Sequence, residues 1–352
     1  IVAAAAGLAG LGLSAGGLVR LADQLPGLAS GASRWELNVN TIQLAQDYWL
    51  TGGGLRAFEG LYSRYARLIQ VPQFTYSHSL YLDLWLEQGL LGLLAFLALY
   101  AAGLARLARA REVDHAVRGA ALAGLLVVLG HGLLDDALYG NAGTPWVCLL
   151  PGVAVGLTHG RVPPFAINRR WARLGAAGLA LAAIGWLSTP AARASLWANL
   201  GAAGLARAEL AGWPERLNAG AAPAGAEAWL RQALALDPTN RAAALRLGLI
   251  AEARGHYAAA ADILEPARPA GLALPAFRKA LGYAYLWSGR GAEAGPLLAT
   301  LAEAPVELFE YARWWRARGR PDLAAQADQM RTWLAAHEHR GPGTPVAPGV
   351  GD

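Results

Sequence analysis

The chain has 352 residues, of which 55% are hydrophobic and only 16% are charged, so it can hold two or three domains and is more apolar than usual soluble proteins. Its formal net charge of +5 comes from arginines that are scattered and gather beside apolar stretches, which argues against a nucleic-acid-binding surface. The single cysteine, Cys148, excludes a disulfide framework and a cysteine-based metal site. Membrane-spanning helices are therefore the first expectation.

Five stretches reach or approach the roughly 17 to 20 apolar residues that a helix needs to cross a bilayer. They are residues 1–19, 89–105, 119–138, 142–158, and 174–187 with an uncharged extension to 192. On length alone, the fourth and fifth could instead be buried helices of a soluble protein. Because the chain opens with Ile1 and runs straight into the first stretch, we expect a fragment that lacks an N-terminal part.

A polar, aromatic-rich segment, residues 32–88, lies between the first two stretches and is too long for a simple connector. It begins with Arg34-Trp35 at the head of an amphipathic helix. The sequence GGGLRAF follows at residues 52–58, and HSLYLDLWLEQGLLG at residues 78–92 leads into the second stretch. Long loops of this kind usually carry function.

The arginines predict the orientation, because cytoplasmic loops carry an excess of basic residues. The loops at residues 106–118 and 161–173 are basic, whereas the turn after the third stretch holds Asp135 and Asp136 and no basic residue. Alternation then places the loop 20–88 and everything after Pro190 on the extracytoplasmic side. Residues 1–190 are therefore predicted to be a polytopic transmembrane helical bundle.

After residue 190 the sequence becomes charged and amphipathic, and it repeats itself. The Leu-Gly pair at 247–248 recurs at 281–282, and the glycine at 255 recurs at 289, both at the 34-residue tetratricopeptide period. We count three repeats and a degenerate cap, so residues 191–340 are predicted to form an α-helical solenoid whose concave face binds a protein partner. The glycine- and proline-rich residues 341–352 are predicted to be a disordered tail. The predicted fold class is therefore all-α throughout.

The motifs in residues 34–92 resemble the Wzy_C region of the O-antigen ligase and polymerase family. That region has an arginine helix, a G-x-G-x-x-x-F turn, and H-N-x-x-L-x-x-x-x-E-x-G-x-x-G leading into a transmembrane helix. The resemblance extends over about residues 34–157, with one departure: Ser79 stands where asparagine usually follows the histidine. It implies a GT-C type glycosyltransferase in the bacterial inner membrane that moves a glycan from undecaprenyl pyrophosphate to an acceptor hydroxyl at the outer face. It also implies inverting chemistry without a metal or cofactor.

The resemblance gives His78 the role of general base or acceptor-orienting group, and an imidazole titrates near neutrality, as proton transfer requires. Arg34 is the first candidate for binding the pyrophosphate and Arg56 the second, since a guanidinium stays charged and can bind phosphate in a bidentate fashion. Glu87 follows His78 at a helical offset and is expected to bind substrate or to pair with an arginine.

A second ionisable cluster, His131 with Asp135 and Asp136, ends the third apolar stretch at its predicted outer end. His131 and Asp135 are four residues apart and so would share a helix face. We expect one of the two aspartates to line the site and to orient an arginine, with ordinary polar capping of the helix as the alternative.

Two other functions stay open. A protein O-oligosaccharyltransferase would use the same region on a protein acceptor, so the acceptor can be lipid, glycan or protein. A non-catalytic membrane-anchored scaffold would use the repeats to recruit partners. The ordered set of Arg34, His78 and Glu87 favours an enzyme, because a tether needs no such block.

Overall fold

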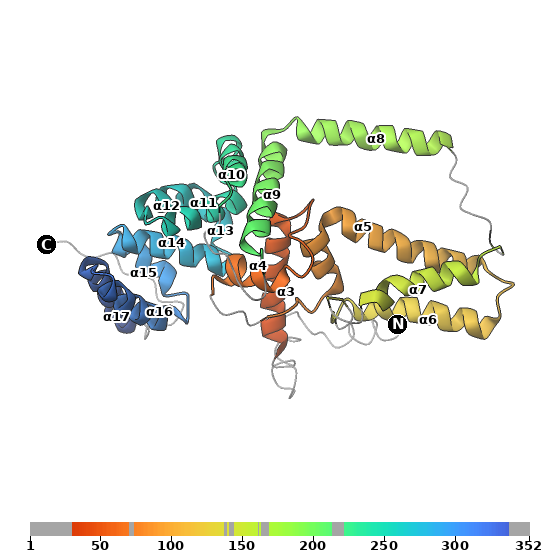
Figure 1. Ribbon diagram of the computed structural model, residues 1–352, viewed down its shortest axis with the longest axis horizontal. Helices are drawn as coiled ribbons and strands as arrows, with labels where there is room; N and C mark the ends of the chain where they lie inside the picture. The colour runs from red at the N-terminus through yellow and green to blue at the C-terminus, as the bar shows by residue number, and fades with distance from the viewer. Residues whose placement is uncertain are drawn as a thin grey trace, which may run out of the picture. The chain divides into compact units, whose positions relative to one another are not determined.

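The computed structural model describes residues 30–69, 74–136, 139–140, 144–160, 162, 169–212 and 222–337. All regular secondary structure in these ranges is helical, which confirms the predicted all-α class for this part of the chain (Figure 1). The chain divides into two compact units, residues 1–59 with 73–172 and residues 60–72 with 173–352. The first predicted span, residues 1–19, lies outside the described residues.

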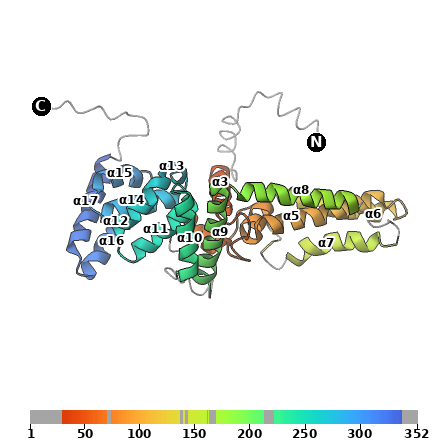
Figure 2. The same cartoon turned by 90° about the horizontal axis from the view of Figure 1, so that it is seen from above.

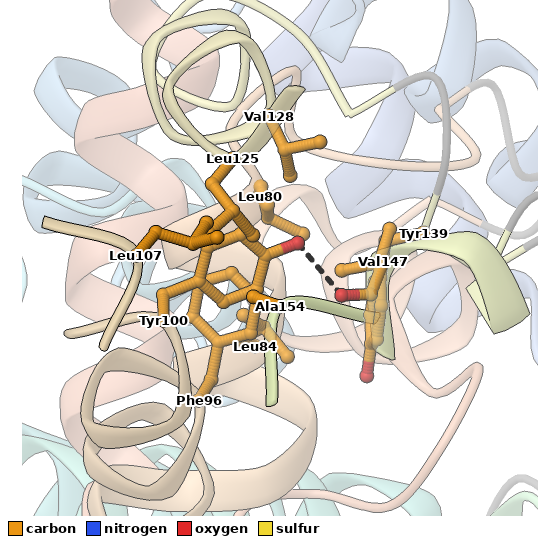
Figure 3. Close-up of a cluster of buried hydrophobic side chains, with 10 residues drawn as sticks. All are labelled: Leu80, Leu84, Phe96, Tyr100, Leu107, Leu125, Val128, Tyr139, Val147 and Ala154. Atoms are coloured by element: carbon orange, nitrogen blue, oxygen red, sulfur yellow. Dashed lines mark hydrogen bonds between the residues drawn. The ribbon is translucent and has the colours of Figure 1, made fainter. Parts of the chain in front are cut away.

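The first unit is built on three apolar helices, α5 (Leu80–Arg109), α6 (His115–His131) and α7 (Thr144–Leu157), which lie side by side (Figures 1 and 2). They enclose the buried cluster drawn in Figure 3, in which the Tyr100 hydroxyl donates a 2.7 Å hydrogen bond to the backbone oxygen of Val147. Helix α3 (Ser30–Asp47) packs against α5. The short helix α4 (Phe58–Leu61) follows it in the loop.

Helix α5 is broken at Gly89, whose φ of 71° and ψ of −175° are not helical. A Cβ at this position would lie 2.1 Å from the backbone oxygen of Leu50, so only glycine fits. The break separates a short helix, residues 80–88, from residues 90–109, which form a rod of about 30 Å, the thickness of the bilayer core.

Among the described helices, α5 is long and apolar enough to cross a membrane by itself, whereas α6 and α7 are apolar but shorter. A second candidate is α8 (Arg169–Leu187), if residues 173–187 are taken together with α9 (Pro190–Glu209), although these two helices meet at a bend of 93°. Large hydrophobic side chains on α5 to α8 point outward, including Leu91, Val127, Leu149, Leu179 and Ile184. Soluble proteins rarely expose so many large apolar side chains on their helices.

Two predicted spans end earlier than expected. The helix of the third stretch stops at His131 rather than at residue 138, and residues 132–134 form a turn. In the fifth stretch, α8 ends at Leu187 and a new helix, α9, begins at Pro190, inside the uncharged extension to residue 192. The Thr189 hydroxyl accepts the backbone N–H of Ala192, and Pro190 occupies the first turn of α9, where it needs no hydrogen-bond partner.

The second unit contains four consecutive helix pairs, each of which packs internally and against the next pair. The pairs are α9 with α10 (Ala224–Leu236), α11 (Arg241–Ala253) with α12 (Tyr257–Leu264), α14 (Pro275–Trp287) with α15 (Gly291–Leu298), and α16 (Ala304–Ala317) with α17 (Pro321–His337). Two short elements, η2 (Glu265–Ala267) and α13 (Arg268–Gly271), connect the second pair to the third.

The 34-residue period has a structural counterpart in these pairs. A Cβ on Gly248 would lie 2.7 Å from Leu264, and a Cβ on Gly282 would lie 2.8 Å from Leu298, which stands 34 residues after Leu264. The turn glycines at 255 and 289 share a left-handed backbone, with φ of 76° and 84°. Both glycines of the Leu-Gly pairs therefore let the partner helix approach closely.

Candidate active site

His78 lies at the entrance to α5, on the stretch of chain that leads out of the polar loop. Its Nδ1 is 3.1 Å from Oδ1 of Asp135, which lies just beyond the end of α6. The two side chains are 27% and 31% exposed, so a substrate can reach them. The ring of Tyr76 packs edge-on against the imidazole at 4.5 Å. The structure thus joins two of the predicted site residues that stand 57 positions apart in the sequence.

Asp83, in the first turn of α5, fixes the backbone next to His78. Both of its carboxylate oxygens accept the Ser77 N–H at 3.1 Å. The Leu80 N–H donates to the backbone oxygen of Gly132 at 2.9 Å, which ties the start of α5 to the end of α6. His78 itself has a left-handed φ of 60°, a strained conformation for a residue with a Cβ. Such strain persists where neighbouring contacts hold the backbone, as they do here.

The Asp135 carboxylate is held in its charged form. Partial burial alone would raise the pKa of Asp135, but the hydrogen bond to His78 and the backbone N–H of Asp136, which donates to Oδ1 at 2.8 Å, lower the pKa below its usual value. A charged carboxylate beside Nδ1 favours the tautomer that carries its proton on Nδ1. Nε2 is then the nitrogen that can accept a proton from a substrate.

A pair of buried carboxyl groups, those of Asp136 and Asp83, lies close to the His78–Asp135 pair. The two residues are only 3% and 1% exposed and are hydrogen-bonded to each other. Burial raises the pKa of Asp136, and the hydrogen bond and negative charge of Asp83 raise it further. Two carboxyl groups so close together cannot both ionise easily, so they share a proton. Asp83 was not predicted as a site residue.

Glu87 joins the two sequence motifs. Its carboxylate accepts hydrogen bonds from the Tyr139 hydroxyl at 3.1 Å and from the backbone N–H groups of Phe58, at 3.4 Å, and Arg56. None of these partners is an arginine side chain, which was one of the two expectations for Glu87. Glu87 is therefore a structural link between the GGGLRAF turn and α5.

The backbones of the two motifs also interlock. The Gly53 N–H donates to the Leu86 oxygen at 2.7 Å, and the Gly54 N–H donates to the Glu87 oxygen at 3.0 Å. A Cβ on Gly52, whose φ is 67°, would lie 2.2 Å from the Glu87 oxygen. One glycine of each motif, Gly52 and Gly89, thus has a direct steric cause.

The predicted pyrophosphate ligands stand apart from this network. Arg34 and Arg56 are exposed, and no hydrogen bond or ion pair links either side chain to another described residue. His131, the last residue of α6, is also exposed and does not share a helix with Asp135, because the helix ends between them. Together with Leu80 and the two aspartates, His131 lines a small cavity of about 50 Å³, which has room for a few water molecules.

Asp135 was expected to orient an arginine, whereas the side chain that it contacts in the described part of the chain is His78. Within the described ranges, no group of three or more His, Cys, Asp or Glu side chains is placed to hold a metal ion.

Comparison with known proteins agrees with the resemblance. The profile of the family described as O-antigen ligase (Wzy_C) matches residues 1–97. The match contains the loop with Arg34, Arg56, His78 and Glu87 and ends within α5, so it includes neither Asp135 nor the helix pairs. It supports a membrane glycan ligase or polymerase role. No curated protein and no solved structure matches the chain.

Proposed function

We propose that this protein transfers a glycan from undecaprenyl pyrophosphate to an acceptor hydroxyl at the outer face of the bacterial inner membrane. The His78–Asp135 pair carries this proposal. It combines a general base with a charged group that orients it, is open to a substrate, and stands one short helix before a candidate membrane span. Its histidine also lies within the residues that match the O-antigen ligase family.

In the proposed reaction, Nε2 of His78 accepts the proton of the acceptor hydroxyl while that oxygen attacks the anomeric carbon of the donor sugar. The bond between this carbon and the pyrophosphate oxygen breaks, and the lipid pyrophosphate leaves with the electron pair. The charge of Asp135 stabilises the imidazolium that forms. Arg34 and Arg56 are exposed guanidinium groups that can bind the leaving pyrophosphate.

The proposed topology places residues 20–88 and everything after residue 190 outside the cytoplasm, with α5 to α8 in the membrane. The outward-facing leucines, isoleucines and valines of these helices support it, as does the arginine bias of the loops. The helix pairs of the second unit are proposed to be tetratricopeptide repeats. A reporter that is active only in the periplasm should be active when it is fused after residue 340. If only a cytoplasmic reporter were active at this position, the predicted orientation would be wrong and the proposed site would lie on the cytoplasmic face.

The function is tested in a strain that lacks its own copy of the gene, with the electrophoretic mobility of the acceptor as the readout. His78→Ala should lower glycan transfer by about 10²- to 10⁴-fold, the usual contribution of a general base. Asp135→Asn should lower transfer less, because Asp135 acts through His78. Arg34→Ala should abolish transfer, and Arg34→Lys should restore part of it, because an ammonium cannot form the bidentate contact.

His115→Ala is the matched control. His115 also stands next to an aspartate, Asp114, at 3.8 Å, but it lies in a loop assigned to the cytoplasm. This variant should transfer glycan at the wild-type rate. Near-normal transfer by His78→Ala, in protein that inserts and accumulates normally, would show that His78 is not the base.

A further inference from the structure

A short helix from the polar loop belongs to the second unit. This π-helix, η1 (Tyr62–Arg67), lies in sequence between α4 and His78, yet residues 60–72 form one compact unit with residues 173–352. Its side chains at Tyr62, Ser63, Tyr65 and Ala66 are at most 3% exposed. The helix ends at Leu68, whose left-handed φ of 51° brings its N–H onto the Ser63 oxygen. π-helices are rare and short, so tertiary contacts must hold this one.

Tyr65 makes the central contact. Its hydroxyl donates to the carboxylate of Glu209, near the end of α9, and its ring lies 4.4 Å from the guanidinium carbon of Arg246 on α11. Glu209 and Arg246 are only 3% and 1% exposed. Charged groups at such depth are costly unless they have partners, and here a residue of the loop contacts both of them. Cation–π contacts of this kind strengthen when water is excluded.

The end of the segment is held by a different helix. Lys279 of α14, which is 1% exposed, donates to the backbone oxygen of Leu68 at 3.3 Å. The same ammonium pairs with Glu303 at 3.0 Å and Glu307 at 2.8 Å. Near the start of the segment, Nε of Arg64 lies 3.6 Å from Oε1 of Glu209. Three helix pairs of the second unit thus present a carboxylate, a guanidinium and an ammonium to one short segment.

From these contacts we infer that the helix pairs bind residues 60–68 of their own chain as a ligand and anchor the loop that carries Arg56 and His78. The surface between α9, α11 and α14 that receives this segment is then not open to another protein. At this surface the helix pairs contact a segment of their own chain, and recruitment of a protein partner stays a prediction for the rest of the solenoid.

The backbone of the loop gives this anchor a purpose. Among the described residues, the three non-glycine residues with positive φ are Arg56, Leu68 and His78, all within this loop. Strained backbone of this kind survives where the surrounding structure fixes it. Fixing residues 60–68 shortens the free chain on the way to both Arg56 and His78, which lowers the entropy cost of holding them. The role in transfer rests on the proposed function, whereas the docking itself does not.

Limited digestion of the full-length protein in detergent tests the docking, because trypsin cleaves after arginine and the segment contains Arg64 and Arg67. In the wild type, cleavage after these residues should be at least tenfold slower than after Arg111, an exposed arginine in a loop of the first unit. Tyr65→Ala should remove this protection without changing a residue of the helix pairs. Tyr65→Phe should keep part of it, because the ring still packs on Arg246. Arg313→Ala, which breaks an exposed ion pair with Glu310, is the control and should change nothing.

Wild-type cleavage after Arg64 and Arg67 as fast as after Arg111, or unchanged cleavage in Tyr65→Ala, would overturn the docking. Glycan transfer is measured on the same variants. Tyr65→Ala should lower transfer at least tenfold in protein whose helix content is unchanged, and normal transfer with fast cleavage would overturn the anchoring role. Failure of the proposed function would show separately, as normal transfer in His78→Ala, and would leave the digestion result unaffected.

Discussion

The helices α5 and α7 of the first unit and the helix pairs of the second are both rich in leucine, but they turn their leucines in opposite directions. On α5 and α7, Leu91 and Leu149 are 66% and 52% exposed. In the second unit, the leucines that meet the glycines of the neighbouring helix, Leu230, Leu264 and Leu298, are fully buried. The helix pairs of the second unit bury their apolar faces by stacking, whereas α5 and α7 of the first unit leave large apolar side chains exposed. In the sequence, the higher hydropathy of α5 and the scarcity of charged residues along it separate these cases.

The glycines at close contacts also differ between the two units. In the first unit, Gly52 and Gly89 let one backbone segment press on another. In the second unit, Gly248 and Gly282 make room for the side chains of Leu264 and Leu298. A backbone atom cannot move aside without moving its segment, whereas the tip of a leucine can rotate. Substitutions of the two kinds of glycine should therefore differ in severity.

The largest effect is expected for Gly89→Ala. The new Cβ would overlap the Leu50 oxygen at 2.1 Å and strain a φ of 71°, so we expect a loss of about 3 kcal/mol or more and no glycan transfer. Gly282→Ala should cost about 1–3 kcal/mol, because Leu298 can adjust. Thermal unfolding in detergent and the transfer assay measure both.

Gly152→Ala is the control for this pair, because no atom lies within 4 Å of the added Cβ on α7. It should behave as the wild type. If Gly89→Ala were as mild as Gly282→Ala, the interlock between the GGGLRAF turn and α5 would not be rigid.

The spacing of the motifs predicted much of the site, for a reason that the glycines make clear. The glycine turn and the block from His78 to Gly92 fit each other only if their glycines stand at these positions, so a pattern of single residues carries the information. The glycines of the Leu-Gly pairs, which showed the 34-residue period in the sequence, likewise stand where helices approach closely.

Other features left no such pattern. Asp83 occupies an ordinary position in a helix, and its role depends on the bend of the chain at His78. The pairing of Asp135 with His78 depends on where α6 ends, which an uninterrupted apolar stretch does not reveal. The docking of residues 60–68 joins Tyr65 to a carboxylate 144 positions away, and neither side has a periodic signal. Contacts of this kind follow from tertiary packing rather than from local sequence.

A pair of leucine substitutions provides an intermediate test. Leu264→Ala removes a fully buried side chain of the second unit and should cost about 2–5 kcal/mol. Leu149→Ala removes a side chain that faces outward on α7 and should cost at most about 0.5 kcal/mol in a lipid-like environment. Thermal unfolding of the full-length protein in detergent measures both. Equal losses would show that α7 packs against protein at Leu149, and the contrast between the two units would fail there.

The smallest expected effect concerns how the stability of the first unit depends on pH. The pKa values of two adjacent carboxyl groups, Asp135 and Asp136, are shifted in opposite directions. The pKa of Asp136 is raised, so the folded state binds its proton more tightly than the unfolded chain does. This contribution to stability is complete below the ordinary aspartate pKa of about 3.9 and is lost as the pH rises through the raised pKa. The pKa of Asp135 is lowered, so its contribution is present above about 3.9 and is lost only in acid.

The unfolding temperature of the wild type should therefore fall by about 2–5 °C as the pH rises from neutral to alkaline, when the proton shared by Asp83 and Asp136 leaves. Asp136→Asn supplies an amide that donates a hydrogen bond at every pH, so this variant should show little change over the same range. Asp135→Asn should still show the fall in unfolding temperature at alkaline pH, because the contribution of Asp135 to stability changes only at acidic pH. A wild-type curve that is flat above neutrality, or an alkaline fall that Asp136→Asn leaves intact, would show that the two buried carboxyl groups do not share a proton.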